Sequence, residues 1–231
     1  MSSRFAEPAT DRAARRASCD VRVWLLRTSA WRARWPDLQR HVDAAANARL
    51  RAIRNPARRQ DRLLAGALHR VVLAEALQVA PDLLPLYRSG SGQPRLAIPG
   101  LHTSLSHADD VVAIALGHGG PVGVDVEMRN EPSLQPIADL VCAPGETAAD
   151  DAALLALWVR KEAALKAAGL GLARAMTSFH APEGGQVCLD DAQGESLALD
   201  VCMLDGTGDC VVAVAAPAGS ALRWQWLHPR I

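Results

Sequence analysis

The chain has 231 residues, 49% of them hydrophobic and 22% charged, which is enough for one large globular domain or two small ones with a buried core. No apolar run reaches the roughly 18 residues of a membrane helix, which argues against a membrane-spanning protein. The formal net charge is zero, but residues 1–70 carry 16 arginines and 6 acidic residues, so the front of the chain suits anionic ligands and the rest suits cations.

The first 18 residues have neither the apolar stretch nor the cleavage-like site of a secretory signal, and we expect them to be a flexible, arginine-rich arm. Residues 21–27 have a pattern typical of a strand. Helices are predicted at 38–54 and 57–79, separated by proline at the Asn55-Pro56 step.

A dense run of arginines spans residues 49–62. It is either a solvated helix face or a surface that binds anions. Nucleic acid is the weaker alternative, because the whole chain is not basic and the run has no interleaved aromatic residues. We therefore expect no nucleic-acid partner and no membrane partner.

A turn-rich loop at 89–94 follows these helices. The next segment predicts a hairpin over 101–116, with its turn near 108–110, and residues 121–127 predict another strand.

Helices are then expected at 133–141 and 145–168, the second ending at Gly169 in a C-cap position. The rest of the chain predicts mostly strand, at 176–181, 186–190, 197–204, 210–216 and 222–227.

The sequence DDVVAIA at 109–115 is echoed by DCVVAVA at 209–215. Buried strands are often rich in valine and alanine, so this echo is either chance or the trace of a duplication. A duplication would give two similar α+β halves, which we place at 19–117 and 118–231, with a ligand cleft between them.

The five cysteines are odd in number, form no CxxC pair and show no metal-ligand spacing. They favour a reducing, cytoplasmic compartment over a disulfide framework.

Two carboxylates stand two residues apart in the strand Gly123–Glu127. Because alternate residues of a strand share a face, Asp125 and Glu127 project together while the valines face the core. They are either solvated charges on an edge strand or ligands of a hard divalent cation, for which magnesium is the expected ion.

The helix that follows carries Trp158, Glu162 and Lys166 at a spacing of four, so the three share one face. Glu162 and Lys166 could be an ordinary surface pair. However, Lys161 and Lys166 are the only lysines in the chain, and a compact ammonium on a flexible stem suits a phosphate site.

Ser106 and His107 end the first strand of the predicted hairpin. A lone histidine there is either a plain turn residue or a donor to a phosphate oxygen.

Together these motifs resemble the 4′-phosphopantetheinyl transferase superfamily, in its larger, surfactin-synthetase-activating type. The resemblance covers roughly residues 49–180 and rests on motifs that follow one another in the same order as in the family. In this chain the motifs are Gly92-Gln93-Pro94, Ser106-His107, Gly123–Glu127, Trp158–Lys166 and Gly169–Leu172, and Cys142–Glu146 precedes the helix that contains Trp158–Lys166.

The resemblance implies an α+β fold built as a pseudo-dimer of two similar halves. It implies transfer of 4′-phosphopantetheine from coenzyme A to a serine of an acyl or peptidyl carrier protein, leaving adenosine 3′,5′-bisphosphate. Such carrier proteins are acidic, so the arginine-rich front of the chain would attract them. A duplicated chain has less need to dimerise, so we expect a monomer.

The resemblance also implies roles for individual residues. Asp125, Glu127 and Glu162 would hold Mg²⁺. The catalytic residues would be Glu162, which activates the serine, and Lys166, which clamps phosphate. Contacts to the donor are expected from Ser106, His107 and several basic or loop residues: Arg49, Arg54, Arg62, Gln93, Lys161 and Lys166.

Two positions depart from the pattern or add to it. The loop residue that is usually Lys or Arg is Gln93, which would weaken the grip on the 3′-phosphate or shift it to Arg88 or Arg95. Glu146 stands where some relatives have a further acidic residue near the metal.

Two other functions fit parts of the pattern. A magnesium nuclease could use Asp125 and Glu162, but the lysine it would need two residues later is Ala164. A non-catalytic binder of carrier proteins would have no reason to keep three converging carboxylates.

Overall fold

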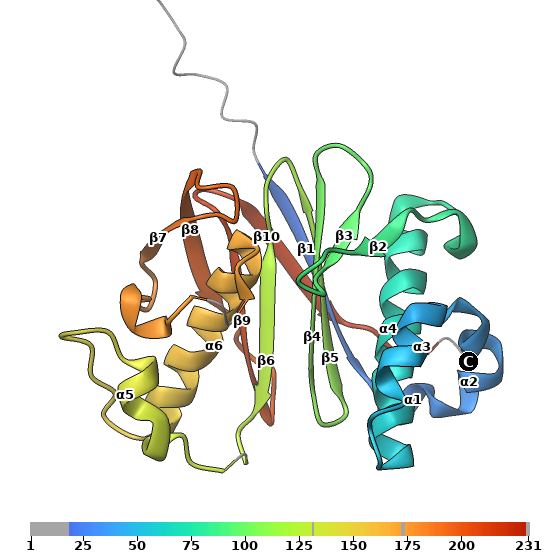
Figure 1. The fold of residues 1–231 in the computed structure, drawn as a ribbon, viewed down its shortest axis with the longest axis horizontal. Helices are drawn as coiled ribbons and strands as arrows, with labels where there is room; N and C mark the ends of the chain where they lie inside the picture. The colour runs from blue at the N-terminus through green and yellow to red at the C-terminus, as the bar shows by residue number, and fades with distance from the viewer. Residues whose placement is uncertain (1–18, 131, 172–173, 230–231) are drawn as a thin grey trace, which may run out of the picture.

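The computed structural model describes residues 19–229 apart from 131, 172 and 173, so the predicted arm at 1–18 lies outside the described residues. Figure 1 shows β6 beside the strands β1, β4 and β5 in the middle of the molecule, with the long helix α4 to the right and the long helix α6, flanked by β7 and β8, to the left. The expected α+β fold is confirmed.

The first half begins with one long strand and ends with a hairpin. Between them lie short helical turns, the long helix α4 and a small two-stranded hairpin. The elements are β1 (Asp20–Arg27), α1 (Thr28–Trp31), α2 (Trp35–Leu38), α3 (Ala44–Leu50), α4 (Pro56–Leu77), β2 (Leu86–Arg88), β3 (Pro94–Leu96), β4 (Leu101–Ala108) and β5 (Val111–His118).

The second half has the same plan of a long helix against a four-stranded sheet. Its elements are β6 (Gly123–Met128), α5 (Ala138–Val141), α6 (Asp151–Ala168), β7 (Gln186–Asp190), β8 (Ser196–Met203), β9 (Cys210–Pro217) and β10 (Ala221–Trp226).

The two large sheets have the strand orders β10-β1-β5-β4 and β6-β9-β8-β7. Every pair in them is antiparallel except β1 with β10, whose register joins Asp20 to Ala221. The last strand therefore crosses back into the sheet of the first, and the chain does not divide cleanly at residue 117.

Three groups of buried side chains hold these layers together. One lies between the two sheets and includes Val23, Val124 and Val214. A second packs α4 on its sheet, and a third packs α6 on the other sheet. Burial of apolar surface on this scale is the main stabilising term in folding.

The repeated sequence segments occupy equivalent places in the two halves. Residues 111–115 lie in β5 and 211–215 in β9, and both are inner strands whose residues are buried. This equivalence favours duplication over chance.

Several predicted elements need correction. Residues 38–54 are not one helix, because Asp43 accepts a hydrogen bond from the backbone N–H of Ala45 and starts the separate helix α3. Helix α6 begins at Asp151, capped by Asp150, rather than at 145. Residues 176–178 form a 3-10 turn instead of a strand, and 133–141 is helical only from Gln135.

No helix among residues 19–229, with the gaps given above, is both long and apolar enough to cross a membrane.

Candidate active site

The edge strands β4 and β6 of the two sheets meet at the centre of the molecule, where serine side chains join them. The backbone N–H of Val124 donates to Ser104 Oγ at 3.1 Å, and Ser106 Oγ donates to Asp125 Oδ1 at 2.7 Å. All four residues are buried. Ser106 therefore fixes the first of the predicted metal ligands from the opposite half.

Helix α6 lies directly against β6 because residue 123 is glycine. A Cβ at Gly123 would overlap the carbonyl oxygen of Ala163 and lie 2.5 Å from the backbone nitrogen of Ala167. Only a residue without a side chain permits this approach, which brings Glu162 of α6 close to Asp125 of β6.

Asp125 and Glu162 are buried carboxylates that keep open oxygens. Asp125 Oδ2 and Glu162 Oε1 are buried, and neither has a hydrogen-bond partner among the described residues. Burial raises the pKa of Glu162, and the negative charge of Asp125 raises it further, against the opposing effect of Lys166. Buried polar atoms without partners are costly and need an explanation.

This donor set fits a hard divalent cation by its chemistry, because it offers carboxylate oxygens, including two buried oxygens without partners. Glu127 lines the same cavity from the next position on that face of β6. As the side chains stand in the described part of the chain, no three His, Cys, Asp or Glu residues lie close enough together to enclose a metal ion.

Lys166 instead contacts Asp125. Its ammonium donates to Asp125 Oδ1 at 2.6 Å, to Ser106 Oγ at 2.9 Å and weakly to the Val124 carbonyl at 3.3 Å. The predicted proximity of Lys166 to this site is therefore present in the structure.

His107 faces the same cavity without a protein partner. Both of its ring nitrogens are buried and unpaired within the described residues. Burial lowers its pKa, and the nearby Arg62 lowers it further. The ring is therefore neutral near pH 7 and offers one N–H donor to a ligand.

A cavity of about 500 Å³ joins these groups and is lined by both halves of the chain. Eight of the residues expected from the sequence line it: Arg49, Arg62, Ser106, His107, Asp125, Glu127, Glu162 and Lys166. Its size and its position between halves are typical of a small-molecule site.

Arginines form the outer rim of the cavity. Arg49 and Arg88 line both this cavity and a second one beside it, whereas Arg54 lines neither. Burial lowers the pKa of Arg88, Arg49 lowers it further, and Asp43 opposes both. Of the arginines expected at the 3′-phosphate, Arg49 and Arg62 line the cavity and Arg54 does not, whereas Arg88, the expected alternative to Gln93, does.

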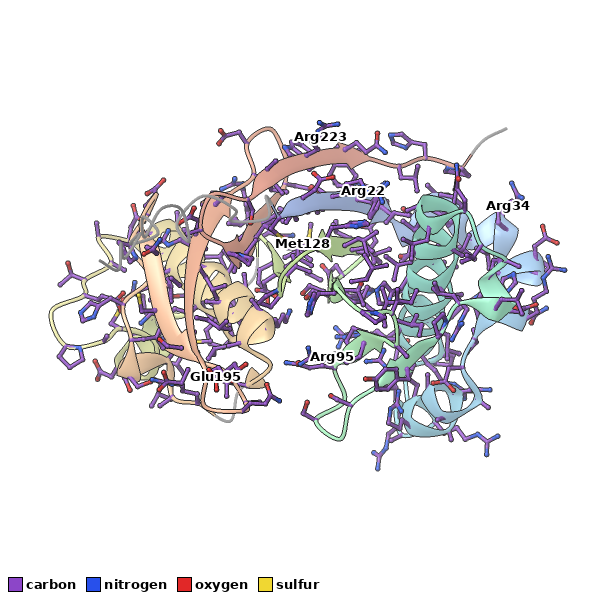
Figure 2. All side chains as sticks on the ribbon, turned by 90° about the horizontal axis from the view of Figure 1, so that it is seen from above. Arg22, Arg34, Arg95, Met128, Glu195 and Arg223 are labelled. Atoms are coloured by element: carbon purple, nitrogen blue, oxygen red, sulfur yellow. The ribbon has the colours of Figure 1, made fainter. Side chains whose placement is uncertain are left out.

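Gln93 does not line the cavity, because its side chain is turned toward Arg95, whose guanidinium donates to Gln93 Oε1 at 3.2 Å. Arg95 reaches from the β2–β3 hairpin to the end of α6, as Figure 2 shows, and a Cβ on Gly169 would lie 2.7 Å from its Nη2. Arg95 is thus poorly placed to replace Gln93 as a contact of the 3′-phosphate, and Arg88, which lines the cavity, is better placed.

Lys161 lies on the other side of α6, and its geometry contradicts the expected phosphate contact. Its side chain has no exposed area, and its ammonium donates to the carbonyls of Val141, Met176 and Phe179 at 2.8 Å each and to Glu146 Oε2. An ammonium has three N–H groups, so none remains for a ligand.

Glu146 likewise serves the structure and does not join the open carboxylates. Besides Lys161, it accepts hydrogen bonds from the backbone N–H groups of Ala143 and Ala181. Burial acts to raise its pKa, but these hydrogen bonds outweigh burial and hold the pKa below its usual value.

His69 lines the cavity but was missed in the sequence. It is fully buried, and its Nε2 lies 2.8 Å from Thr103 Oγ1, which itself donates to the Ala115 carbonyl. Burial lowers its pKa to about 3, with Arg88 and Arg70 adding to the effect. His69 follows Arg62 by seven residues, about two helical turns, so the two share a face of α4, and this spacing is the sequence feature that could have indicated it.

Comparison with known protein families gives one match over the second half. Residues 121–214 match the model of the 4′-phosphopantetheinyl transferase superfamily. This range contains Asp125, Glu127, Glu162 and Lys166.

Individual relatives extend the similarity toward the first half. The chain is 31% identical over 155 residues to 4′-phosphopantetheinyl transferase AcpT of Escherichia coli, covering 62% of this chain and 75% of that protein. The AcpT of Salmonella typhimurium is 30% identical, over 58% of this chain and 72% of its own length. The transferase psf-1 of Bacillus pumilus is 32% identical, over 55% of this chain and 58% of its own length.

Proposed function

Because the chain belongs to the 4′-phosphopantetheinyl transferase superfamily, we propose that it moves 4′-phosphopantetheine from coenzyme A to a serine hydroxyl of an apo acyl or peptidyl carrier protein. Adenosine 3′,5′-bisphosphate is the other product. The observation that carries this proposal is a buried pair of carboxylates with open oxygens, facing a cavity whose rim is arginine-rich.

Asp125, Glu127 and Glu162 would hold magnesium, because the first and last have buried oxygens without partners and all three line one cavity. The bound ion would neutralise the donor's pyrophosphate and the charge that develops on the transferred phosphorus.

The basic groups of the cavity bind and orient the donor. Arg49, Arg62 and Arg88 lie on its rim and attract the phosphates of coenzyme A. His107 donates an N–H from deeper in the cavity, where its nitrogens have no protein partner among the described residues.

Glu162 takes the proton of the carrier serine. Burial raises its pKa, and a carboxylate with a raised pKa is a stronger base. The serine oxygen then forms a bond to the phosphorus that bears pantetheine, and the bond from that phosphorus to the bisphosphate leaving group breaks.

The proposal extends to subtype, assembly and compartment. One chain supplies both walls of the cavity, which supports the larger surfactin-synthetase-activating type acting as a monomer. The surplus of arginine in residues 1–70 supports acidic carrier proteins as partners. The five cysteines are all free, which supports a cytoplasmic location.

The direct test mixes the protein with coenzyme A, magnesium and an apo carrier protein and measures the mass of the carrier. Transfer of one phosphopantetheine group, a phosphoryl transfer, adds about 340 Da. A carrier whose serine is changed to alanine is the control and gains nothing. The absence of a mass gain over fatty-acid, polyketide and peptidyl carriers at millimolar magnesium would refute the proposal.

A further inference from the structure

The ammonium of Lys166 occupies one carboxylate oxygen of Asp125, the first of the predicted metal ligands. It contacts Asp125 Oδ1 at 2.6 Å, and that oxygen also receives the hydroxyl of Ser106. The carboxylate of Asp125 is 4% exposed, so few positions remain from which a cation can reach it.

Lys166 neutralises this pair of carboxylates only in part. Asp125 Oδ2 and Glu162 Oε1 receive no hydrogen bond from the described residues. An ammonium reaches carboxylates as a hydrogen-bond donor, whereas a magnesium ion binds several oxygens at about 2.1 Å and carries twice the charge. The ion therefore satisfies oxygens that the lysine leaves open.

Lys166 is less enclosed by protein oxygens than Lys161. Its side chain is 22% exposed and borders the cavity, and one of its three contacts is as long as 3.3 Å. Lys161 has no exposed area and four oxygen acceptors.

We propose that Lys166 is a built-in competitor of the metal: in the metal-free protein it holds the charge of Asp125, and metal binding displaces its ammonium into the cavity. The displaced ammonium then faces the space assigned to the donor's phosphates, so the protein loads metal before it grips the donor fully. This inference rests on the metal site of the proposed function.

The chain offers an internal reference for a direct measurement, because Lys161 and Lys166 are its only lysines. The full-length protein is labelled with ¹³C,¹⁵N-lysine, and Lys166→Met assigns the two side-chain signals. Adding Mg²⁺ to the wild type should shift the Lys166 signal and leave the Lys161 signal in place. An unshifted Lys166 signal at metal saturation would overturn the proposal.

Metal affinity gives a second readout that needs no activity. Calorimetric titration with Mg²⁺, in the absence of coenzyme A, compares the wild type with Lys166→Met, which keeps the length of the side chain and removes its charge. We expect about tenfold tighter binding, a typical size for coupling between two bound groups.

Removing any nearby positive charge favours a metal, so a matched control is needed. Arg62→Gln removes a charge from the same cavity, and no ion pair of Arg62 with Asp125 exists within the described residues. The gain for Lys166→Met should exceed the gain for Arg62→Gln several-fold. Equal gains in Mg²⁺ affinity for the two variants would show that any nearby positive charge weakens metal binding, and they would overturn the proposed competition by Lys166.

Failure of the inference can be told from failure of the proposed function. Asp125→Asn should weaken the Mg²⁺ binding seen in the wild type. If neither protein binds Mg²⁺, the metal site itself is wrong. If binding depends on Asp125 while Lys166→Met changes nothing, the metal site stands and the competition by Lys166 is refuted.

Discussion

Helix α6 carries both lysines of the chain, and each pairs with a carboxylate from outside the helix. The pair of Lys161 and Glu146 is complete, because carbonyls surround the ammonium and backbone N–H groups surround the carboxylate. The pair of Lys166 and Asp125 leaves one buried oxygen, Asp125 Oδ2, without a partner among the described residues and borders a cavity.

The difference distinguishes a structural ion pair from a binding site. Buried charges are retained where hydrogen bonds satisfy them, and breaking such a set is costly. Polar atoms that line a cavity without hydrogen-bond partners instead destabilise the protein, and a bound ligand can remove this destabilisation. Lys161 and Lys166, five positions apart on one helix, thus differ in role. Lys161 fixes the loops that contain its carbonyl acceptors, and Lys166 lies at a ligand-binding cavity.

The largest effect that can test this comparison is on catalysis. Glu162→Gln should lower the rate of transfer to the carrier by about 10²–10⁴-fold, because the base is lost, while the protein remains folded. The rate is measured as carrier mass gain over time, with circular dichroism as the check on folding. Retention of most activity would contradict the assignment of Glu162.

The matched change in the complete pair should act on stability. Glu146→Gln leaves the buried ammonium of Lys161 without a counter-charge, and we expect a loss of about 3–5 kcal/mol in the free energy of unfolding. Urea unfolding at pH 7 measures this loss. If the variant were as stable as the wild type but inactive, Glu146 would belong to the active site instead.

The outer rim should show a smaller contrast. Arg49→Gln should raise the KM for coenzyme A by about tenfold, as expected for the loss of one charged hydrogen bond. Arg54, which is exposed and outside the cavity, serves as the control, and Arg54→Gln should change this KM little. Equal effects of the two changes would mean that the rim extends farther than the cavity lining.

The mildest test is the pH dependence of stability. The folded-state pKa of Glu146 lies below its ordinary value of 4.5, so its contribution is complete above that pH and is lost as pH falls through the lowered pKa. The stability difference between wild type and Glu146→Gln should therefore shrink below pH 4.5. A difference that stays constant through this range would contradict the role of the Glu146 charge.

Local patterns predicted the parts of the fold that local forces determine. The hairpin at 101–116 and the strands near residues 186–226 follow from alternation and turn residues, and they match β4, β5 and β7 to β10. The segment 176–181 failed as a strand for a nonlocal reason, since carbonyls of Met176 and Phe179 face Lys161.

The candidate site shows the same limit. Spacing grouped Asp125 with Glu127 on β6 and Glu162 with Lys166 on α6, the family resemblance brought the two groups together, and all four line one cavity. Lys161 was misjudged because a count of lysines carries no information about burial. His69 was missed because a buried histidine on an apolar helix face looks like packing until the opposite wall of the cavity is known.

The pairing of β1 with β10 has a consequence for how the protein is made. Strand β1 is among the first described residues to leave the ribosome, yet its outer neighbour spans residues 221–226. Until then β1 keeps an open edge, which is a template for wrong pairing. Joining segments so far apart in sequence is slow, so β1 depends on late synthesis for its completion. A nascent chain therefore keeps an unpaired strand edge in the sheet that supports β4 and its serines.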